Sequence, residues 1–538
     1  MSRWLAELAA GVAADPDPVA ARARALAGVV EAVAAAHGIR LPPLELRHRW
    51  GRPARVAVPR AEAVPGVVPR ATDALLPRSE RRRLGAYATP PEVAAELVGR
   101  ALDASPVHTP AVCDPAAGGG ALLLAAAEAG VGMVRLSGTD VDPVSAAAAT
   151  AALCLRSGGA AVPPVGAADA LRPAPWPGRP DVVVGNPPFR SPLRGGAPTD
   201  RRLGPYADVA AAFLLRALDE MAGGGVVGLL LPVSFLASRD AAPARRRALE
   251  AAELVVVWRP DARFRGALVD VCAVVLRRGG GRRTTGASWA PLVADAPDVV
   301  TQGGDLLGAR FDVAADFRAH YYAVAPHVVD GPADGDDAVF PPLVTAGLVD
   351  PAACAWGERP ARHGGRRWAA PRVDLAGLSA DGHGDWARRR LVPKVVVASQ
   401  TRVVEAAVDA AGAWLPSVPL VSVTGPVDHL WHAAAVLLSP VTTAGVLRRG
   451  AGTALATDHL KLGAPQVRDL PLPPDGPDWD EAAAAVRAAS SATDPTRRRA
   501  ALLDAAVASC AAYGVPADGL VDWWAARLPP ENGSRRWR

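Results

Sequence analysis

The spacing of apolar positions changes several times along the chain, and each change predicts a different kind of element. Residues 1–37 are Ala-rich and predict helix, interrupted at Asp15-Pro16-Asp17-Pro18, and a Pro/Arg-rich stretch to about residue 80 predicts an irregular connector. From residue 81 to about 280, short β-branched runs alternate with Ala/Leu stretches of helical length. The expected strands are 111–113, 133–139, 181–184, 226–231, 254–258 and 269–276. Strands separated by helix-length segments predict βαβ units and a mainly parallel sheet.

Beyond this block the pattern predicts a different organisation. Gly279-Gly280-Gly281 is typical of a linker, the section to about residue 475 mixes short strand-like runs with Trp and Arg, and residues 478–528 return to a helical pattern. We therefore expect four segments: a helical segment with its connector (1–80), an α/β domain (81–285), a mixed α+β domain (286–475) and a helical tail (476–538).

Composition narrows the possible chemistry. Of 59 basic residues only Lys394 and Lys461 are lysine, and neither follows a Gly-rich turn, which excludes a Walker-type phosphate loop. The five cysteines form no CxxC pair and no zinc spacing, so we expect no metal. An odd cysteine count without a signal peptide favours a reducing cytoplasm. The longest apolar run, 226–236, is shorter than a bilayer span and predicts no membrane association.

A Gly-rich turn follows the first expected strand. Asp114, Pro115 and Ala116 lead into Gly118, Gly119 and Gly120 before the helix-forming run 121–129. Such glycines let a ligand approach the backbone closely. Position 123 is Leu where a dinucleotide fingerprint has glycine, which disfavours a nicotinamide cofactor, and Asp114 would repel a pyrophosphate. A ligand with an ammonium or sulfonium group suits this turn better.

Two further acidic turns follow the next strands. The second strand ends at Asp140-Val141-Asp142, where a carboxylate can accept both hydroxyls of a ribose, and Asp169 lies where a third strand should end. A single acid at a strand end is often a helix cap. Three in succession favour S-adenosylmethionine as the ligand.

The fourth expected strand runs into Asn186-Pro187-Pro188-Phe189, the most specific pattern in the chain. The prolines keep carbonyls at the strand end out of the sheet ladder. The Asn186 side chain and the Pro187 carbonyl can then accept both protons of one planar NH2 group and free its nitrogen lone pair. Phe189 offers a flat face to a planar base. An ordinary Asn-Pro turn with a core Phe is the structural alternative.

These residues, in this order, resemble the γ-class DNA adenine-N-6 methyltransferases. Gly85 to Glu92 is similar to the family's N-terminal cofactor motif, which implies cofactor contacts for Tyr87 and Thr89. The resemblance assigns the segment from Asp114 to Gly120 to the main cofactor loop, Asp140 to the ribose and Asp169 to the adenine of the cofactor. Asn186 to Phe189 matches the catalytic signature, and Phe264 resembles the aromatic residue that packs on an extruded base.

The C-terminal part resembles this family more loosely. Residues 399–404 and 460–473 look like a TaqI-like specificity domain, and 499–514 resembles the helical tail of restriction-modification fusion enzymes. The implied fold is a Rossmann-like S-adenosylmethionine-dependent methyltransferase sheet with a C-terminal mixed α+β DNA-recognition domain and a helical tail. The implied function is methyl transfer to the N-6 amine of a flipped-out adenine in double-stranded DNA, in a restriction-modification or related defence system, with a separately encoded endonuclease or defence subunit as a further partner.

Basic residues gather at two places that fit a nucleic-acid partner. Residues 351–403 carry ten basic side chains against four acidic ones, with Trp356, Trp368 and Trp386 interleaved. The segment after Phe189 carries Arg190, Arg194, Arg201 and Arg202, and we expect these and Arg402 to contact DNA. A solvated Arg-rich face over an ordinary core is the structural alternative.

Two other functions remain open at this point. The Asn-Pro-Pro-Phe pattern also serves methyltransferases acting on guanine in ribosomal RNA or on protein glutamine, because each substrate presents a planar NH2. A catalytically silent DNA-binding subunit is the second alternative, although such a subunit has no use for the acids or for Asn186.

Overall fold

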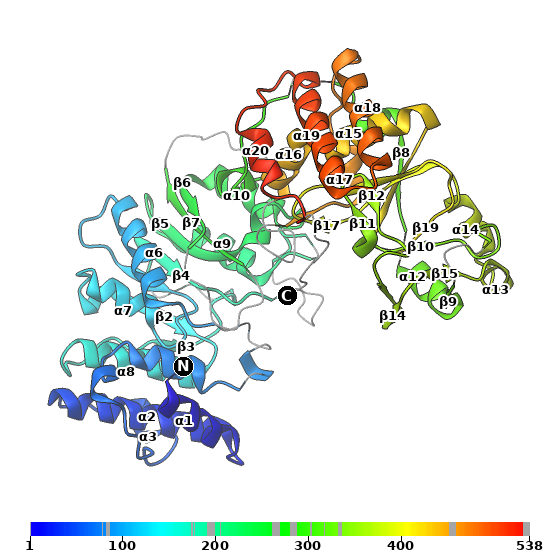
Figure 1. Ribbon diagram of the computed structural model, residues 1–538. Coiled ribbons are helices and arrows are strands. Elements are labelled where there is room, and N and C mark those ends of the chain that lie inside the picture. The colour runs from blue at the N-terminus through cyan, green and yellow to red at the C-terminus, as the bar shows by residue number, and fades with distance from the viewer. Residues whose placement is uncertain are drawn as a thin grey trace. The chain divides into compact units, whose positions relative to one another are not determined.

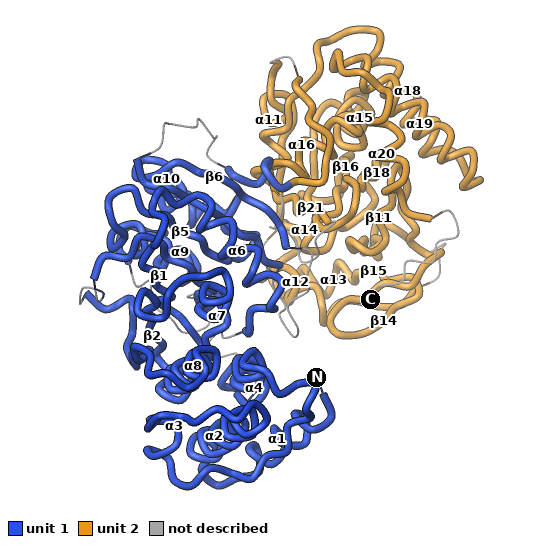
Figure 2. Tube along the Cα trace, turned by 90° about the vertical axis from the view of Figure 1, so that its left-hand side faces the viewer, with its two compact units in different colours: residues 1–293 blue, residues 294–538 orange. Residues whose placement is uncertain are grey.

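The computed structural model divides the chain into two compact units, residues 1–293 and 294–538 (Figure 2). It describes residues 2–77, 79–81, 85, 87–173, 176, 178–190, 200–204, 206–260, 270–279, 288–301, 304–316, 318–331, 336–450 and 459–530. Phe264 and Arg194 lie outside these ranges. The four segments expected from the sequence are smaller than the two units, and their separate domain status stays a prediction.

Unit 1 is built on a seven-stranded sheet in the order β3-β2-β1-β4-β5-β7-β6. All neighbouring strands from β3 to β5 pair in parallel, and β7 alone runs antiparallel to β5 and β6. The bounds are β1 Val112–Asp114, β2 Leu136–Asp140, β3 Gly166–Ala167, β4 Val182–Gly185, β5 Val226–Pro232, β6 Ala252–Trp258 and β7 Val271–Arg278. The mainly parallel sheet expected from the β-branched runs is confirmed, as is the Rossmann-like fold that the resemblance implies.

Helices cover both faces of this sheet (Figure 1). One layer holds α6 (Pro91–Ala104), α7 (Ala121–Glu128) and α8 (Pro143–Arg156), and the other holds α9 (Val209–Glu220) and α10 (Ala242–Ala251). The central strands β4 and β5 are buried along their whole length, which explains their continuous apolar runs without alternation.

The N-terminal helices form a further layer over α8. The predicted interruption is confirmed: α1 spans Arg3–Ala13 and α2 spans Pro18–His37, with the Asp17 carboxylate capping the start of α2 and Gly38 in the left-handed region ending it. The expected irregular connector is wrong for two stretches, because α3 (Glu45–His48) and α4 (Val67–Ala74) are helices. Both α2 and α4 pack against α8, so this segment shares the core of unit 1.

Unit 2 is a mixed α+β arrangement, as expected. Its largest sheet is antiparallel, in the order β18-β16-β20-β8. The helices α15 (Leu430–Leu438), α18 (Pro477–Ser491) and α19 (Pro495–Ala512) pack against one another and share one apolar core with this sheet. The strands and remaining helices of unit 2 are β8 Asp312–Ala315, β9 Val328–Asp330, β10 Leu343–Val344, β11 Val349–Asp350, β12 Ala353–Cys354, β13 Ala361–His363, β14 Arg366–Trp368, β15 Pro371–Val373, β16 Lys394–Val397, β17 Gln400–Thr401, β18 Ala406–Asp409, β19 Leu415–Pro416, β20 Val421–Thr424, β21 Leu460–Lys461, α11 Leu307–Arg310, α12 Arg318–Val324, α13 Leu375–Ala380, α14 Gly384–Arg390, α16 Pro440–Gly450, α17 Ala464–Arg468 and α20 Leu520–Ala525.

Among the described helices, none is by itself long and apolar enough to cross a membrane. The bent pair Val427–Leu438 and Pro440–Gly450 meets that test by length and composition only.

Two glycines of the N-terminal layer allow a matched test of its packing. A Cβ on Gly28 of α2 would overlap the carbonyl oxygen of Ala54, whereas a Cβ on Gly11 of α1 meets nothing within 4 Å. We expect Gly28→Ala to destabilise unit 1 by about 1–3 kcal/mol through overpacking. Gly11→Ala should instead stabilise α1 by about 0.5–1 kcal/mol, because alanine loses less backbone entropy in a helix. Thermal unfolding of both variants measures the difference, and equal melting temperatures would contradict this packing.

Candidate active site

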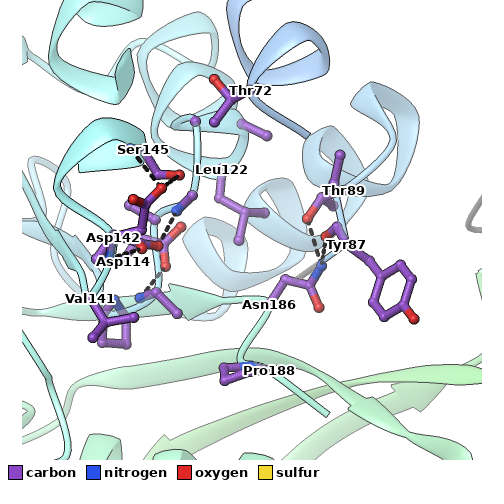
Figure 3. A pocket seen from close by; sticks show the side chains of 18 of the residues that line it. Thr72, Tyr87, Thr89, Asp114, Leu122, Val141, Asp142, Ser145, Asn186 and Pro188 are labelled. Carbon is purple, nitrogen blue, oxygen red and sulfur yellow. Dashed lines mark hydrogen bonds between the residues drawn. The ribbon is translucent and has the colours of Figure 1, made fainter. Parts of the chain in front are cut away.

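The carboxyl ends of β1, β2 and β4 meet at one edge of the sheet. Because β2 lies on one side of β1 and β4 on the other, the chain reverses its strand order here, which opens a crevice outside the strand ends. A cavity of about 180 Å³ occupies this position. Figure 3 shows acidic side chains at one end of it and Asn186 with Thr89 and Tyr87 at the other.

The acidic end is held by backbone hydrogen bonds. Asp114 is 1% exposed, and its Oδ1 accepts the N–H of Ala116 at 3.0 Å. The two carboxylate oxygens of Asp140 accept the N–H groups of Gly118 at 2.8 Å and of Asp142 at 2.9 Å. Each oxygen keeps a second lone pair, so the Asp140 carboxylate can still accept hydroxyl groups from a ligand.

The turn between β1 and α7 requires its glycines. Gly118 and Gly120 have φ of 54° and 89°, the left-handed region that favours glycine. A Cβ on Gly119 would lie 2.6 Å from the Cα of Pro69 in α4. The turn is therefore packed directly against the N-terminal layer.

Burial sets the electrostatics of this end. Burial raises the pKa of Asp114 to about 8, with the neighbouring Asp140 charge acting in the same direction and the Ala116 N–H opposing it. Burial also raises the pKa of Asp140 to about 6, although the N–H groups of Asp142 and Gly118 favour its charged form. A cation entering the cavity would stabilise both charged carboxylates.

One cation already reaches this end from the N-terminal layer. Arg22 of α2 forms an ion pair with Asp142, and both side chains are largely shielded from solvent, at 5% and 16% exposure. The Asp142 carboxylate also accepts the backbone N–H and the hydroxyl of Ser145 and thereby caps α8. Asp142 is thus fixed by groups from two different layers.

The opposite end orients an amide. The Asn186 amide nitrogen donates to the carbonyl oxygen of Tyr87 at 2.9 Å and to the hydroxyl of Thr89 at 3.1 Å. A carbonyl cannot donate, so the nitrogen must face it, and the Asn186 Oδ1 points away from both partners (Figure 3). None of the described residues donates a hydrogen bond to this oxygen, so among them it is an unused acceptor.

The other residues predicted for the site divide into two groups. Pro115, Ala116, Gly118, Asp142, Asp169 and Pro188 line the cavity, together with Tyr87 and Thr89. Pro187 is buried and Gly120 directly precedes α7 as its N-cap, and neither lines the cavity. Phe189 is half-buried and packs against the core of unit 1. The roles assigned to all these residues stay predictions.

The basic residues after Phe189 differ in their surroundings. Arg190 is exposed and lines the cavity, and Arg201 is exposed. Arg202 forms ion pairs with Asp200 at 2.6 Å and Asp219 at 2.9 Å, which offset its charge. Arg402, between β17 and β18 of unit 2, is also exposed.

Several residues that line the cavity were not predicted from the sequence. Pro69, Thr72, Asp73 and Leu76, from α4 and the residues just after it, all line the cavity, as does Phe213 of α9. The spacing of Val67, Val68, Ala71 and Leu75 along α4, all buried, is a signal that could have predicted this helix. The partnership of Arg22 with Asp142 has no local signal, because the two residues are 120 positions apart.

The basic side chains of the stretch 351–403 differ in whether they form ion pairs. Five of its ten basic side chains form ion pairs with acids: Arg359 with Asp350, Arg372 with Asp337, Arg388 with Asp385, Arg390 with Asp316 and Lys394 with Asp409. Trp386 also donates its indole N–H to Asp316, at 2.9 Å. At least half of the basic side chains in this stretch are therefore paired with acids of unit 2 itself.

Comparisons with known proteins bear on unit 1 above all. Residues 76–291 match the model of the N-6 DNA methylase family. No curated protein matches the sequence significantly.

Similar solved structures include a protein from Listeria monocytogenes assigned to the class I S-adenosylmethionine-dependent methyltransferases. It has 14% identity over 54% of this chain and 91% of that chain, with a TM-score of 0.38. The type IIG restriction endonuclease BpuSI has 12% identity over 99% of this chain and 80% of its own, with a TM-score of 0.45. The methyltransferase subunit of a type I restriction-modification system from Streptococcus thermophilus has 21% identity over 40% of this chain and 50% of its own, with a TM-score of 0.30.

The raised pKa of Asp114 predicts how stability depends on pH. The folded state holds the Asp114 proton up to about pH 8, whereas the unfolded state loses it near pH 4. The folded state therefore binds more protons between these values, and the free energy of unfolding should fall as the pH rises through this window. The Asp114→Asn variant keeps a side-chain oxygen that accepts the Ala116 N–H but carries no charge. Its free energy of unfolding should therefore fall less over this pH window than that of the wild type.

Thermal unfolding at pH 5 and pH 8 checks this expectation. From pH 5 to pH 8, the melting temperature of the wild type should fall further than that of Asp114→Asn. An identical loss in both proteins would show that Asp114 is charged throughout.

Proposed function

Because residues 76–291 match the model of the N-6 DNA methylase family, we propose that this protein transfers a methyl group from S-adenosylmethionine to the N-6 amine of an adenine in double-stranded DNA. The observation that carries the proposal is the orientation of the Asn186 amide. Its nitrogen donates to Tyr87 and Thr89, and its oxygen, which accepts from none of the described residues, can accept from an amine at the carboxyl end of β4.

The proposed role of Asn186 is to hold the target amine. Its Oδ1 accepts one N–H of the adenine amine, and the Pro187 carbonyl accepts the other. Both bonds favour a nitrogen whose lone pair has left conjugation with the ring, which makes it a better nucleophile. As the new nitrogen–methyl bond forms, the methyl–sulfur bond breaks, and the nitrogen then releases one of its protons to solvent. The protein contributes orientation and fixed dipoles, with no strong base at the amine.

The acidic end of the cavity fits the proposed cofactor. When bound, S-adenosylmethionine supplies an activated methyl group on a positively charged sulfur. Asp114 and Asp140 have pKa values raised by burial and gain from a nearby cation, which matches a ligand carrying sulfonium and ammonium groups. We assign the ribose hydroxyls to Asp140, and the cofactor adenine to the part of the cavity beside Asp169.

The amine of a paired adenine cannot reach Asn186 at the bottom of a crevice while it is stacked in the duplex. The proposal therefore includes rotation of the nucleotide out of the helix, at a cost of a few kcal/mol. Phe189 and Phe264 are the side chains we assign to stacking on the extruded base. Base–aromatic stacking of about 1–3 kcal/mol per base is comparable to that cost.

The family also suggests a biological setting. We propose that the methylation serves a restriction-modification or related defence system, with a separately encoded endonuclease or defence subunit as partner. Sequencing that reports methylated bases, in DNA from cells expressing the protein, tests the substrate base and its sequence context together.

The division of labour within the cavity gives a direct test. Asn186→Ala should lower the rate of methyl transfer at least about 100-fold, because it removes an oriented acceptor at the reacting amine. Its affinity for S-adenosylmethionine should stay near that of the wild type. Asp140→Ala should weaken cofactor binding by about 1–3 kcal/mol, the cost of a lost charged hydrogen bond. Single-turnover transfer and calorimetric titration measure the two effects separately.

Three outcomes would contradict the proposal. Equal loss of cofactor affinity in Asn186→Ala and Asp140→Ala would contradict the separate roles assigned to these two residues. Methylation of ribosomal RNA or of protein glutamine, with duplex DNA untouched, would favour the alternative NH2 substrates. A wild-type protein that binds DNA without binding the cofactor would be a silent subunit.

Thr89 gives a second, sharper test, because its hydroxyl accepts from Asn186 and it also lines the cavity. Thr89→Val keeps the shape and removes the acceptor, so we expect the transfer rate to fall about 5–20-fold, the loss of one hydrogen bond. Thr89→Ser should retain most of the rate. This hydrogen bond favours a role for Thr89 at Asn186 over the cofactor contact implied by the resemblance, so cofactor affinity should stay unchanged in both variants. A parallel loss of affinity in Thr89→Val would restore the cofactor contact.

A further inference from the structure

The strands β13 and β14 of unit 2 form a short hairpin that displays arginine. Arg362 pairs with Arg367 and His363 pairs with Arg366 across the two strands. The turn is Gly364-Gly365, with φ of 59° and 76°. Two consecutive positive φ values match the tight hairpin turn whose twist suits its flanking strands.

One face of this hairpin is fixed to the body of unit 2. His363 is 1% exposed, its Nδ1 lies 3.1 Å from the Ser417 hydroxyl oxygen, and its ring lies 4.3 Å from that of Tyr321. The Tyr321 hydroxyl accepts the N–H of Gly364 at 3.0 Å, and the Trp368 indole donates to the His363 carbonyl at 3.1 Å. The hairpin is therefore a rigid support for its exposed side chains.

Three arginine side chains of the hairpin are exposed: Arg362 and Arg367 share the face opposite His363, whereas Arg366 lies on the His363 side beside the turn. Among the described residues, the structure pairs none of these arginines with an acid. Arg362 and Arg367 face each other directly across the ladder, where like charges are destabilising. This contrasts with the five ion-paired basic residues of the same stretch, and it indicates that the hairpin keeps its charge for an external anion.

An exposed aromatic side chain accompanies the hairpin. Tyr322 follows Tyr321 in α12 and is 66% exposed, and the two rings meet edge to face with centroids 5.5 Å apart. The same helix thus anchors the hairpin turn through Tyr321 and presents Tyr322 to solvent. Arginine together with exposed tyrosine is a combination that contacts phosphates and base edges in protein–DNA interfaces.

We propose that the β13–β14 hairpin binds duplex DNA by entering its major groove, with Arg362, Arg366 and Arg367 as the contacting side chains. The major groove admits a two-stranded β-ribbon, and arginine binds both phosphates and the guanine edge there. This inference rests on the proposed function, because it names the element that holds the DNA for the site in unit 1.

The test compares two triple variants that remove the same charge. The hairpin variant is Arg362→Gln/Arg366→Gln/Arg367→Gln. The control is Arg52→Gln/Arg156→Gln/Arg497→Gln, three other exposed arginines for which the structure gives no ion pair among the described residues. Fluorescence anisotropy then measures binding to a duplex oligonucleotide over roughly 50 to 300 mM salt.

We expect the hairpin variant to bind at least about 10-fold more weakly and its salt slope to fall by about 2 to 3, since each lost phosphate contact removes about 0.9 from the slope. The control should bind like the wild type. Both variants should unfold and bind S-adenosylmethionine like the wild type, and the hairpin variant should raise the KM for DNA more than it lowers kcat.

The inference and the proposed function can fail separately. If the wild type methylates duplex DNA and the hairpin variant binds as the control does, the hairpin inference is overturned and the function stands. If the wild type binds duplex DNA through the hairpin but methylates no adenine, the inference stands and the function fails. Equal or tighter hairpin-dependent binding to duplex RNA would overturn the assignment to DNA.

Discussion

The chemistry available to this fold depends on which way the Asn186 amide points. The Tyr87 carbonyl can only accept, so it holds the amide nitrogen and leaves the oxygen available. Segment 87–89 is in turn fixed by α6, which begins at Pro91 and buries Val93, Leu97 and Val98 in the core of unit 1. The two groups that orient this amide thus lie in the short segment that leads directly into a helix packed on the sheet.

The acidic end depends on a different constraint, the cost of burying charge. Asp114 and Asp140 are the last residues of neighbouring parallel strands, so the topology brings them to the same edge of the sheet whatever their charge. A Cβ at Gly185, the residue before Asn186, would lie 3.7 Å from Asp114 Oδ1, so the acidic and amide ends of the cavity are continuous. Burial raises the pKa of Asp114 to about 8 and that of Asp140 to about 6, so near neutral pH and without a cationic ligand the folded protein favours protonated Asp114 but leaves Asp140 largely charged. A cationic ligand reverses that preference, and the same feature that destabilises the protein at high pH then stabilises the complex.

Much of this arrangement could be predicted from the sequence, because its signals are local. Runs such as 226–231 are continuously apolar since both faces of β5 are covered, and the Asn-Pro-Pro pattern marks a strand end that cannot continue its ladder. The helix α4 was not predicted because Pro65 lies just before it and Pro69 lies in its first turn, and both residues are typical of irregular segments. Charge counting over 351–403 could not separate Arg372, which is buried against Asp337, from Arg367, which is exposed, because ion pairing depends on contacts distant in sequence.

The most distant of these contacts concerns the N-terminal layer. Arg22 reaches Asp142, and a Cβ at Gly119 would meet both Pro69 and Thr72, so the cavity has one wall outside the sheet and its covering helices. A ligand that fills the cavity gains contacts with α4 only when this layer is docked on α8. Docking of the N-terminal layer increases the affinity for the ligand by some free energy. By thermodynamic linkage, a bound ligand must favour the docked layer over the undocked one by the same free energy. The N-terminal helices are therefore part of the binding site in the thermodynamic sense, although the sequence pattern sets them apart from the sheet.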